Sequence, residues 1–331
     1  MRSASDPNLG PGLVWRGSGP VRACLTLCEW RGKGIENLHA VNLPYQGGIA
    51  MKPALGEVRI GTSGWSYKEW EGPFYPKGEK KKLTFYSKFF KTVEIDSTFY
   101  AYPSQGMIIG AGKSTPADFV FSAKLPKLIT HQKTLDVEQG VKEDLFRFMH
   151  LMKPLLDEGK LGPLLIQLPP SFSYSAGVKR LKAFLEVLPS DVSFAVEFRN
   201  KSWMGKEDAL DLLRAHNVAI TNVDEPLLPA DTTTTADFAF VRWHGHGERP
   251  WYNYRYKQDE LEDWKEKVQA VAAKTKRVYG YFNNHFRGYA VENSLKMMEL
   301  LGETSADQKR MLDLVSKRIE AGFKKTQATL V

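Results

Sequence analysis

Eight short runs rich in β-branched and aromatic residues constrain the fold of this chain more than any other feature. They begin at Val58, Thr92, Phe119, Leu161, Ser193, Val218, Phe238 and Arg277. Amphipathic segments separate most of the runs, and in one of them Val141, Leu145, Phe148 and Met152 recur at helical spacing. Strands that alternate with helices form parallel sheets, and eight such repeats predict a (β/α)8 TIM barrel of the α/β class.

Three segments modify this regular alternation. MIIGAGKSTPAD, after the second run, has only a weak helical pattern, and PLLPADTTTTAD, after the sixth, has essentially none. ADQKRMLDLVSKRIEAGF, after the eighth repeat, predicts an additional helix. No linker divides residues 51–331, so we expect one barrel domain there, with a weak or missing helix after strand six and an extra C-terminal helix.

Residues 1–50 differ in composition from the rest of the chain. They are rich in Gly and Pro and show no sustained hydrophobic period, whereas a clear strand pattern begins soon after Met51. Such a composition is typical of segments without a packed core. We therefore expect residues 1–50 to be a disordered or non-native extension.

Charge, hydropathy and cysteine content indicate which partners, metal sites and cell compartment to expect. The formal net charge is +8, which favours anionic partners. No apolar run approaches the roughly 20 residues that span a bilayer, so no membrane association is expected. The only cysteines, Cys24 and Cys28, lack further ligands for a zinc or iron–sulfur site, and their scarcity favours the cytoplasm.

Polar residues gather at the ends of the predicted strands. Glu94 and Asp96 lie on one face of the second strand, and Lys124 ends the third. Glu197 and Arg199 end the fifth strand in the same way. In TIM barrels, functional residues lie at the C-terminal ends of the strands and in the loops that follow, so the convergence predicts a site.

The leading hypothesis is an enzyme, a hydrolase of an anionic small molecule such as a sugar phosphate, a nucleotide or a nucleic-acid fragment. Arg199, Lys124 and Arg242 would bind the anion. Glu197 and Glu94 are the candidates for acid and base. His131 or His244 would transfer a proton, and Trp65, Tyr67 and Trp203 would stack on a ring.

Two alternatives remain open. Glu94 and Glu197 are also the pair that a glycoside hydrolase would use, but the sequence does not give the distance between their carboxyl groups. A barrel that binds a ligand or a partner without turnover is the other alternative. No cofactor is predicted, although the spacing of His244 and His246 raises a divalent metal as a less favoured option.

Nine motifs resemble those of the YecE-like family, known as domain of unknown function 72. They occur in order from Gly61 to Ser294: GTSGWSYKEW, FYP, TVEIDSTFY, FSAKLPKLITH, LLIQLPPSF, AVEFRNKSW, VDEP, VRWHGHG and YFNNHFRGYAVENS. The resemblance implies a TIM barrel but no established reaction. Two positions depart from the family pattern: Asp96 stands where Asn is expected more often, and His246 stands where a basic residue such as Arg is usual.

The resemblance also implies that the strand-end residues gather in one pocket. The matching residues are Trp65, Tyr67, Glu94, Asp96, Tyr100, Lys124, His131, Gln167, Glu197, Arg199, Trp203, Asp224, Arg242, His244, Asn283, Asn284 and Tyr289. Glu197, Glu94, His131 and His244 are the catalytic candidates among them, and we expect the others to bind the substrate.

Overall fold

Eight parallel strands form the barrel predicted from the sequence. The computed structural model describes residues 55–248 and 250–329, so the predicted extension over residues 1–50 lies outside the described residues. The strands are β1 (Glu57–Thr62), β2 (Thr92–Ile95), β3 (Val120–Lys124), β4 (Leu161–Gln167), β5 (Phe194–Glu197), β6 (Ala219–Asp224), β7 (Phe238–Trp243) and β8 (Arg277–Phe282). Their order in the sheet is β1-β8-β7-β6-β5-β4-β3-β2.

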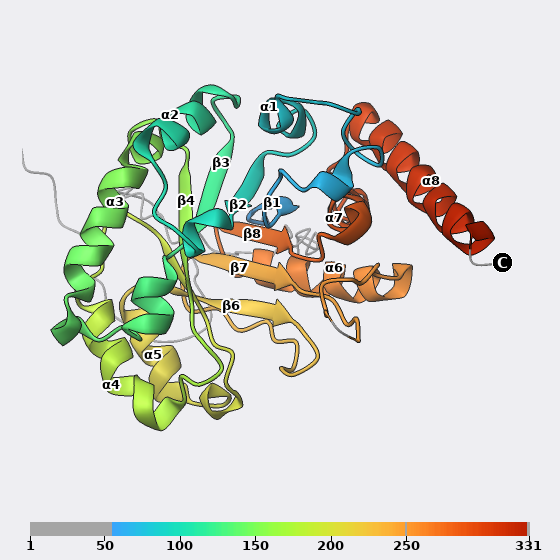
Figure 1. Ribbon diagram of the computed structural model, residues 1–331. Coiled ribbons are helices and arrows are strands. Elements are labelled where there is room, and N and C mark those ends of the chain that lie inside the picture. Colours follow the sequence, from blue (N-terminus) through green and yellow to red (C-terminus); the bar gives the residue numbers. More distant parts are fainter. Residues whose placement is uncertain (1–54, 249, 330–331) are drawn as a thin grey trace, which may run out of the picture. The chain divides into compact units, whose positions relative to one another are not determined.

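Helices follow the strands in chain order and lie outside the sheet (Figure 1). They are α1 (Lys82–Tyr86), α2 (Gln105–Lys113), α3 (Val141–Asp157), α4 (Tyr174–Leu185), α5 (Glu207–Ala215), α6 (Gln258–Ala272), α7 (Tyr289–Leu300) and α8 (Ala306–Thr329). No helix separates β6 from β7, and α8 is the additional helix beyond α7, as predicted. The fold class is therefore confirmed.

The seam between β1 and β2 completes the barrel without a regular ladder of hydrogen bonds. Ser63 and Glu94 form an isolated parallel bridge, and the Gly64 amide donates to the Glu94 carbonyl at 2.8 Å. Below this bridge the Tyr86 hydroxyl accepts from the Thr62 amide at 3.0 Å and donates to the Thr92 carbonyl at 3.1 Å. A side chain from α1 therefore satisfies backbone groups that a ladder would otherwise pair.

Two apolar regions support the barrel. Inside it, Leu165, Ala195, Phe240 and Tyr281 pack together. The Tyr281 hydroxyl also forms hydrogen bonds with side chains of β2 and β3, at 2.7 and 2.8 Å. A larger cluster fills the space between the strands and the helices. Because the interior is packed below the strand ends, polar in-facing residues nearer the C-terminal ends lie above an apolar floor.

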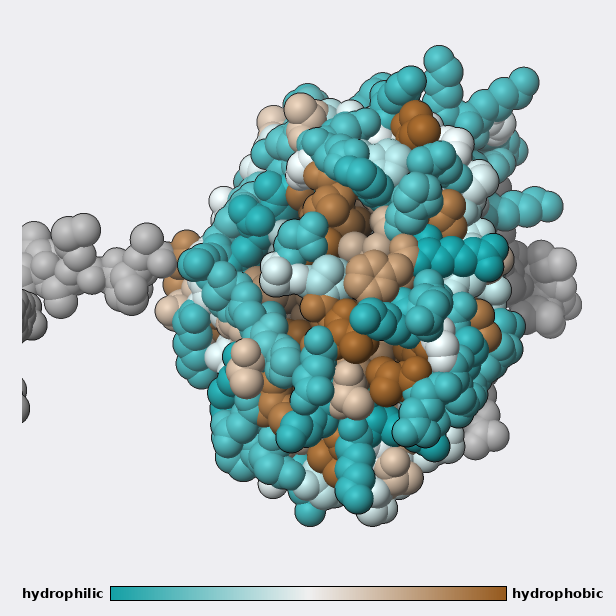
Figure 2. Space-filling view, turned by 90° about the vertical axis from the view of Figure 1, so that its left-hand side faces the viewer, coloured by the Kyte–Doolittle hydropathy of each residue, from teal (hydrophilic) through white to brown (hydrophobic). Residues whose placement is uncertain are grey.

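None of the described helices combines the length and the apolar character that crossing a bilayer requires. Hydrophilic side chains cover most of the face shown in Figure 2, and apolar residues show between them. Scattered apolar surface of this kind is normal for a globular domain.

Candidate active site at the C-terminal ends of the strands

The register of the sheet decides which polar side chains meet inside the barrel. Side chains alternate between the two faces of a strand, and registered residues of parallel neighbours face the same way. Arg242 is in register with Val223 and Tyr281, and Tyr281 lies in the interior cluster. The corresponding interior positions near the strand ends are Ser63, Glu94, Lys124, Gln167, Glu197, Val223, Arg242 and Asn283.

Arg242 is the centre of a buried ion network. Its Nη2 donates to Glu94 Oε1 at 2.8 Å, and its Nη1 donates to Glu197 Oε2 at 2.7 Å. All three side chains are completely buried. Ser63 Oγ donates to the same Glu94 oxygen at 2.5 Å. Two carboxylates share one guanidinium, which compensates their burial in the low-dielectric interior.

Glu197 is held in its ionised form. Burial alone would raise its pKa, but Arg242 and Arg199 outweigh burial and hold the pKa well below the usual range. Arg199 Nε donates to Glu197 Oε1 at 2.7 Å, so each oxygen of Glu197 accepts from a different guanidinium. Because an acid catalyst must carry a proton, Glu197 is unsuited to the role of general acid.

His244 is a buried imidazole that is held in its neutral form. Burial, assisted by Arg242, lowers its pKa to about 3. Asn283 Nδ2 lies 3.0 Å from His244 Nδ1. Arg242 Nη1 and Arg199 Nη2 lie 3.4 and 3.5 Å from His244 Nε2, so donors approach both ring nitrogens. Nε2 lies 3.6 Å from Glu197 Oε1. His244 is therefore committed to neighbours within the network.

Arg199 is the cation of the network that reaches the mouth. Its side chain is 18% exposed, whereas that of Arg242 is 0% exposed. Its Nε is bound to Glu197, and its Nη2 lies 3.5 Å from His244 Nε2. Nη1 has no hydrogen-bond partner in the part of the chain that the structure describes, so one edge of the guanidinium is available to an anion.

Lys124 and Asp96 form a second ion pair at the mouth. Lys124 Nζ lies 2.5 Å from Asp96 Oδ1, and the Asp96 side chain is 25% exposed. Burial and the nearby Arg242 lower the pKa of Lys124, although Asp96 and Glu94 oppose them. The pKa of Asp96 is lowered because Lys124 outweighs the effect of burial. The unusual Asp96 therefore serves as the partner of Lys124.

Two titratable groups at the mouth have pKa values shifted toward one another. Burial, with Arg199 and Lys124, lowers the pKa of His131. Burial also raises the pKa of Glu225, and Arg199 is the main opposing charge. Glu225 is 5% exposed, and its carboxylate has no hydrogen-bond partner among the described residues. An imidazole and a carboxyl group shifted in this way suit a base and an acid, respectively.

Sequence reasoning missed Glu225 and assigned Asp224 to the pocket instead. Asp224 is in register with Trp243, which packs outward against Trp264 of α6. Its carboxylate accepts from Tyr256 at 2.6 Å and lies 2.9 Å from His246 Nε2, so it is occupied outside the interior layer. Strand alternation predicts this difference: Val223 is in register with the interior Arg242, so Asp224 points outward and Glu225 points toward the site.

His244 and His246 do not face the same partners. Gly245 between them has φ +90°, a conformation that Gly adopts without a steric penalty. His244 consequently faces Asn283 and Glu197, whereas His246 faces Asp224. Among the described residues, no group of three or more His, Cys, Asp or Glu side chains is arranged to hold a metal ion.

Several aromatic residues form the rim of the mouth. Tyr67 stacks on His285, with ring centroids 4.4 Å apart, and Tyr252 lies 6.3 Å from the same imidazole. Tyr100 is 65% exposed, and partial burial, with Asp96 and Tyr252 nearby, raises its pKa. These rings surround the network, and Tyr100 offers an open face to a ligand.

Three predicted binding residues have structural partners elsewhere. Trp203 lies between the rings of Phe172 and Phe198, at 5.7 and 4.2 Å, so both faces of its indole are covered. Asn284 Nδ2 donates to Asn293 Oδ1 and to the Tyr254 carbonyl, both at 2.8 Å. Tyr289 begins α7 and is 4% exposed. Two further predicted residues lie near strand ends. Gln167 is in register with Glu197, and Trp65 follows β1.

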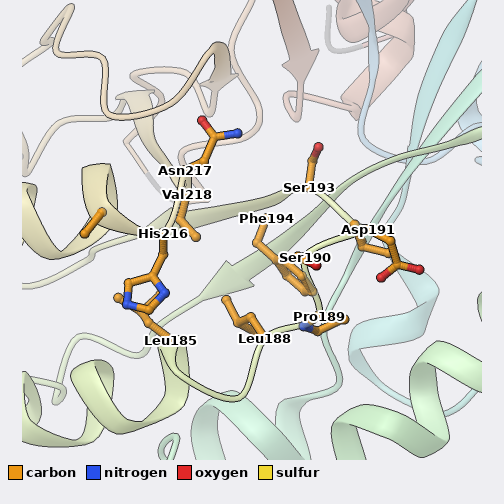
Figure 3. A pocket seen from close by; sticks show the side chains of 12 residues that line it. Leu185, Leu188, Pro189, Ser190, Asp191, Ser193, Phe194, His216, Asn217 and Val218 are labelled. Atoms are coloured by element: carbon orange, nitrogen blue, oxygen red, sulfur yellow. The ribbon is translucent and has the colours of Figure 1, made fainter. Parts of the chain in front are cut away.

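A cleft of ≈ 420 Å³ lies at the opposite end of the barrel. It is formed by residues that precede β5 and β6, including Asp191, His216 and Asn217 (Figure 3). Asn217 exchanges hydrogen bonds of 3.0 and 2.9 Å with Asp237. Because the N-terminal end of a TIM barrel serves stability, and because this cleft contains none of the predicted site residues, we assign it no catalytic role.

Comparison with known proteins places the chain in a family. The chain is 31% identical over 282 residues to the UPF0759 protein YunF of Bacillus subtilis (strain 168), an alignment that covers 78% of this chain and 99% of YunF. It is 29% identical over 215 residues to the UPF0759 protein YecE of Escherichia coli (strain K12), covering 57% of this chain and 74% of YecE.

Solved structures agree with the sequence relatives. The crystal structure of a DUF72 family protein from Thermotoga maritima MSB8 has a TM-score of 0.68 and 35% identity, covering 75% of this chain and 100% of that one. A DUF72 family protein from Enterococcus faecalis V583, at 24% identity and a TM-score of 0.66, shares the fold. The family model described as "Protein of unknown function DUF72" matches residues 59–314. The chain therefore belongs to the DUF72 family.

Proposed function

We propose that this protein is an enzyme that hydrolyses a small anionic ester at the C-terminal mouth of the barrel. One observation carries the proposal. The partly exposed Arg199 guanidinium influences the pKa of both His131 and Glu225, and the pKa is lowered overall for His131 and raised overall for Glu225. Arg199 would bind the anionic group through its free edge. Lys124 would add a second positive charge when the substrate displaces it from Asp96.

The proton transfers follow from the directions of the two pKa shifts: the lowered pKa of His131 favours a neutral imidazole, and the raised pKa of Glu225 favours a protonated carboxyl group. Neutral His131 would accept a proton from water as the water oxygen attacks the phosphorus or carbonyl carbon of the ester. Protonated Glu225 would give its proton to the departing oxygen, so that the products together contain the added water. Glu94, Glu197 and His244 would hold Arg242 and Arg199 in place and would not transfer protons.

The pairing of Glu94 and Glu197 does not favour a glycoside hydrolase. A retaining or inverting glycosidase needs one protonated carboxyl group beside one carboxylate. Here both candidates bind one guanidinium, and the lowered pKa of Glu197 keeps it ionised. Hydrolysis of an anionic ester therefore fits the arrangement better.

Replacement of Glu225 by Gln is expected to lower kcat at least about 100-fold with little change in KM, because the amide cannot donate the proton to the leaving group. The measurement is hydrolysis of a panel of phosphate monoesters, phosphate diesters and anionic carboxylate esters. Glu303→Gln is the matched control, because burial also raises the pKa of Glu303 but this residue lies in a cleft with Glu57 and Lys91.

Equal losses in the Glu225 and Glu303 variants would contradict the assigned role. Binding of panel members without hydrolysis of any of them would contradict the proposed enzyme and support a ligand-binding barrel.

A further inference from the structure

A basic cleft lies on the side of the barrel formed by α1 and the end of α2, outside the Arg242 network. Its volume is ≈ 600 Å³. Its lining includes Trp65, Glu79, Lys80, Lys81, Lys82 and Lys113. Four lysines and one glutamate give this lining a net charge of +3. Lys80, Lys81 and Lys82, which are consecutive in the chain, therefore form one wall of the cleft.

Most of the positive charge in the cleft is not neutralised locally. Lys82 is paired with Glu71 at 2.7 Å and lies over the Tyr75 ring. The exposed side chains of Lys80, Lys81 and Lys113 have no acidic partner within the described parts of the chain. Glu79 Oε1 accepts the Lys81 amide at 2.7 Å, so this carboxylate is held against the backbone. Three ammonium groups are thus available to an anionic ligand.

Trp65 contributes an aromatic surface to the same cleft. Its backbone is fixed because the Tyr75 hydroxyl donates to the Trp65 carbonyl at 2.5 Å. The side chain is half-buried against the core cluster, and its indole ring stacks on no other aromatic ring among the described residues. An anchored indole beside several lysines is the combination that stacks a base and neutralises its phosphates.

We propose that this cleft binds single-stranded nucleic acid. One unpaired base would stack on Trp65, and Lys80, Lys81 and Lys113 would contact neighbouring phosphates. A duplex is not the expected ligand, since its bases are already stacked and paired. An acidic protein segment would pair with the lysines, but its carboxylates would not stack on the indole ring. The inference does not depend on the reaction proposed for the barrel mouth.

The test is fluorescence anisotropy with fluorescein-labelled oligo(dT) and oligo(U) of 12 nucleotides, between 50 and 200 mM salt. The variant Lys80→Gln/Lys81→Gln/Lys113→Gln is expected to weaken binding at least 10-fold. It should also reduce the slope of log K against log salt by about 2, because each single-strand phosphate contact contributes about 0.7. Lys142→Gln/Lys179→Gln/Lys274→Gln removes the same charge from exposed lysines elsewhere and should weaken binding less than 3-fold.

Trp65 is tested with two substitutions. Trp65→Leu keeps an apolar side chain against the core but removes the stacking surface, and should weaken binding about 10-fold, whereas Trp65→Phe should retain part of the affinity. The proposal is overturned if the wild type does not bind either oligonucleotide at 50 mM salt. It is also overturned if the two triple variants lose the same affinity, or if duplex DNA of equal length or poly-glutamate competes as well as the single strands.

Discussion

Replacement of Arg242 by Met is expected to destabilise the protein by about 3–5 kcal/mol, because it leaves two buried carboxylates without a counter-charge. Arg242 is completely buried and donates to Glu94 at 2.8 Å and to Glu197 at 2.7 Å. Met fills a similar space but donates no hydrogen bond. The free energy of unfolding from urea titration at pH 7 measures the effect.

Two further variants separate charge from packing. Arg277→Met removes an exposed arginine that pairs with Glu57 at 2.9 Å, and should cost less than about 1 kcal/mol. Adding Glu94→Gln and Glu197→Gln to Arg242→Met removes the uncompensated charges and should restore most of the lost stability. A loss below 1 kcal/mol for Arg242→Met, or a triple variant less stable than the single one, would refute the central role of this arginine.

The stability of the protein should fall as pH decreases below 6.5, and His244 should account for much of the loss. In the folded protein the pKa of His244 is about 3, compared with an ordinary value of 6.5. Between these values the unfolded chain binds a proton that the native state does not, so the free energy of unfolding rises with pH. The histidine contributes its full stabilisation above pH 6.5 and loses it progressively as pH falls toward 3.

His244→Gln isolates this contribution, because Gln does not titrate. Between pH 6.5 and 5, His244 should account for about 2 kcal/mol of the decrease, at about 1.4 kcal/mol per pH unit. His131 and His285 also have pKa values lowered mainly by burial and add to the slope, so the variant should flatten it without abolishing it. His150→Gln, on the exposed surface of α3, is the control and should leave the slope unchanged. Identical slopes in the wild type and the His244 variant would contradict a neutral, buried imidazole.

The sequence predicted the barrel well because strand pattern is a local property. Each predicted strand starts within one residue of the observed one, from Val58 against Glu57 to Arg277 at the same position. The absence of a helix before β7 and the presence of α8 were equally visible in local composition. The Tyr86 hydroxyl at the β1–β2 seam was not, because its partners Thr62 and Thr92 meet it only after the barrel closes.

Side-chain direction explains which of the predicted site residues meet inside the barrel. Glu94, Lys124, Glu197 and Arg242 were expected at strand ends, and strand alternation brings them to one interior layer. The role of each residue was not predictable from the sequence, because it depends on hydrogen bonds between different strands. Arg242 and Arg199 fix Glu197 as an anion, which removes it from acid catalysis.

The structure places three predicted residues away from the interior layer, each for a different reason. The positive φ of Gly245 turns His246 away from His244, and alternation along β6 directs Asp224 outward, as its register with Trp243 shows. Trp203 has an aromatic side chain near a strand end, the pattern expected of a stacking residue, but phenylalanines cover both faces of its ring.

The central claim is that Arg199 binds an anion at the barrel mouth, and a thermal-shift titration tests it most directly. The ligands are charged and neutral pairs of matched size: glucose 6-phosphate with glucose, ribose 5-phosphate with ribose, and butyl phosphate with butanol. A ligand at about 100 times its Kd adds about 2.7 kcal/mol to the stability of the folded state. Arg214→Ala, which removes an exposed arginine from α5, is the control for net charge.

We expect at least one anion to stabilise the wild type and the Arg214 variant, its neutral counterpart to have little effect, and Arg199→Ala to abolish the shift. If no anion stabilises the wild type, or if Arg199→Ala reduces the shifts of charged and neutral ligands equally, the proposed anion site is wrong.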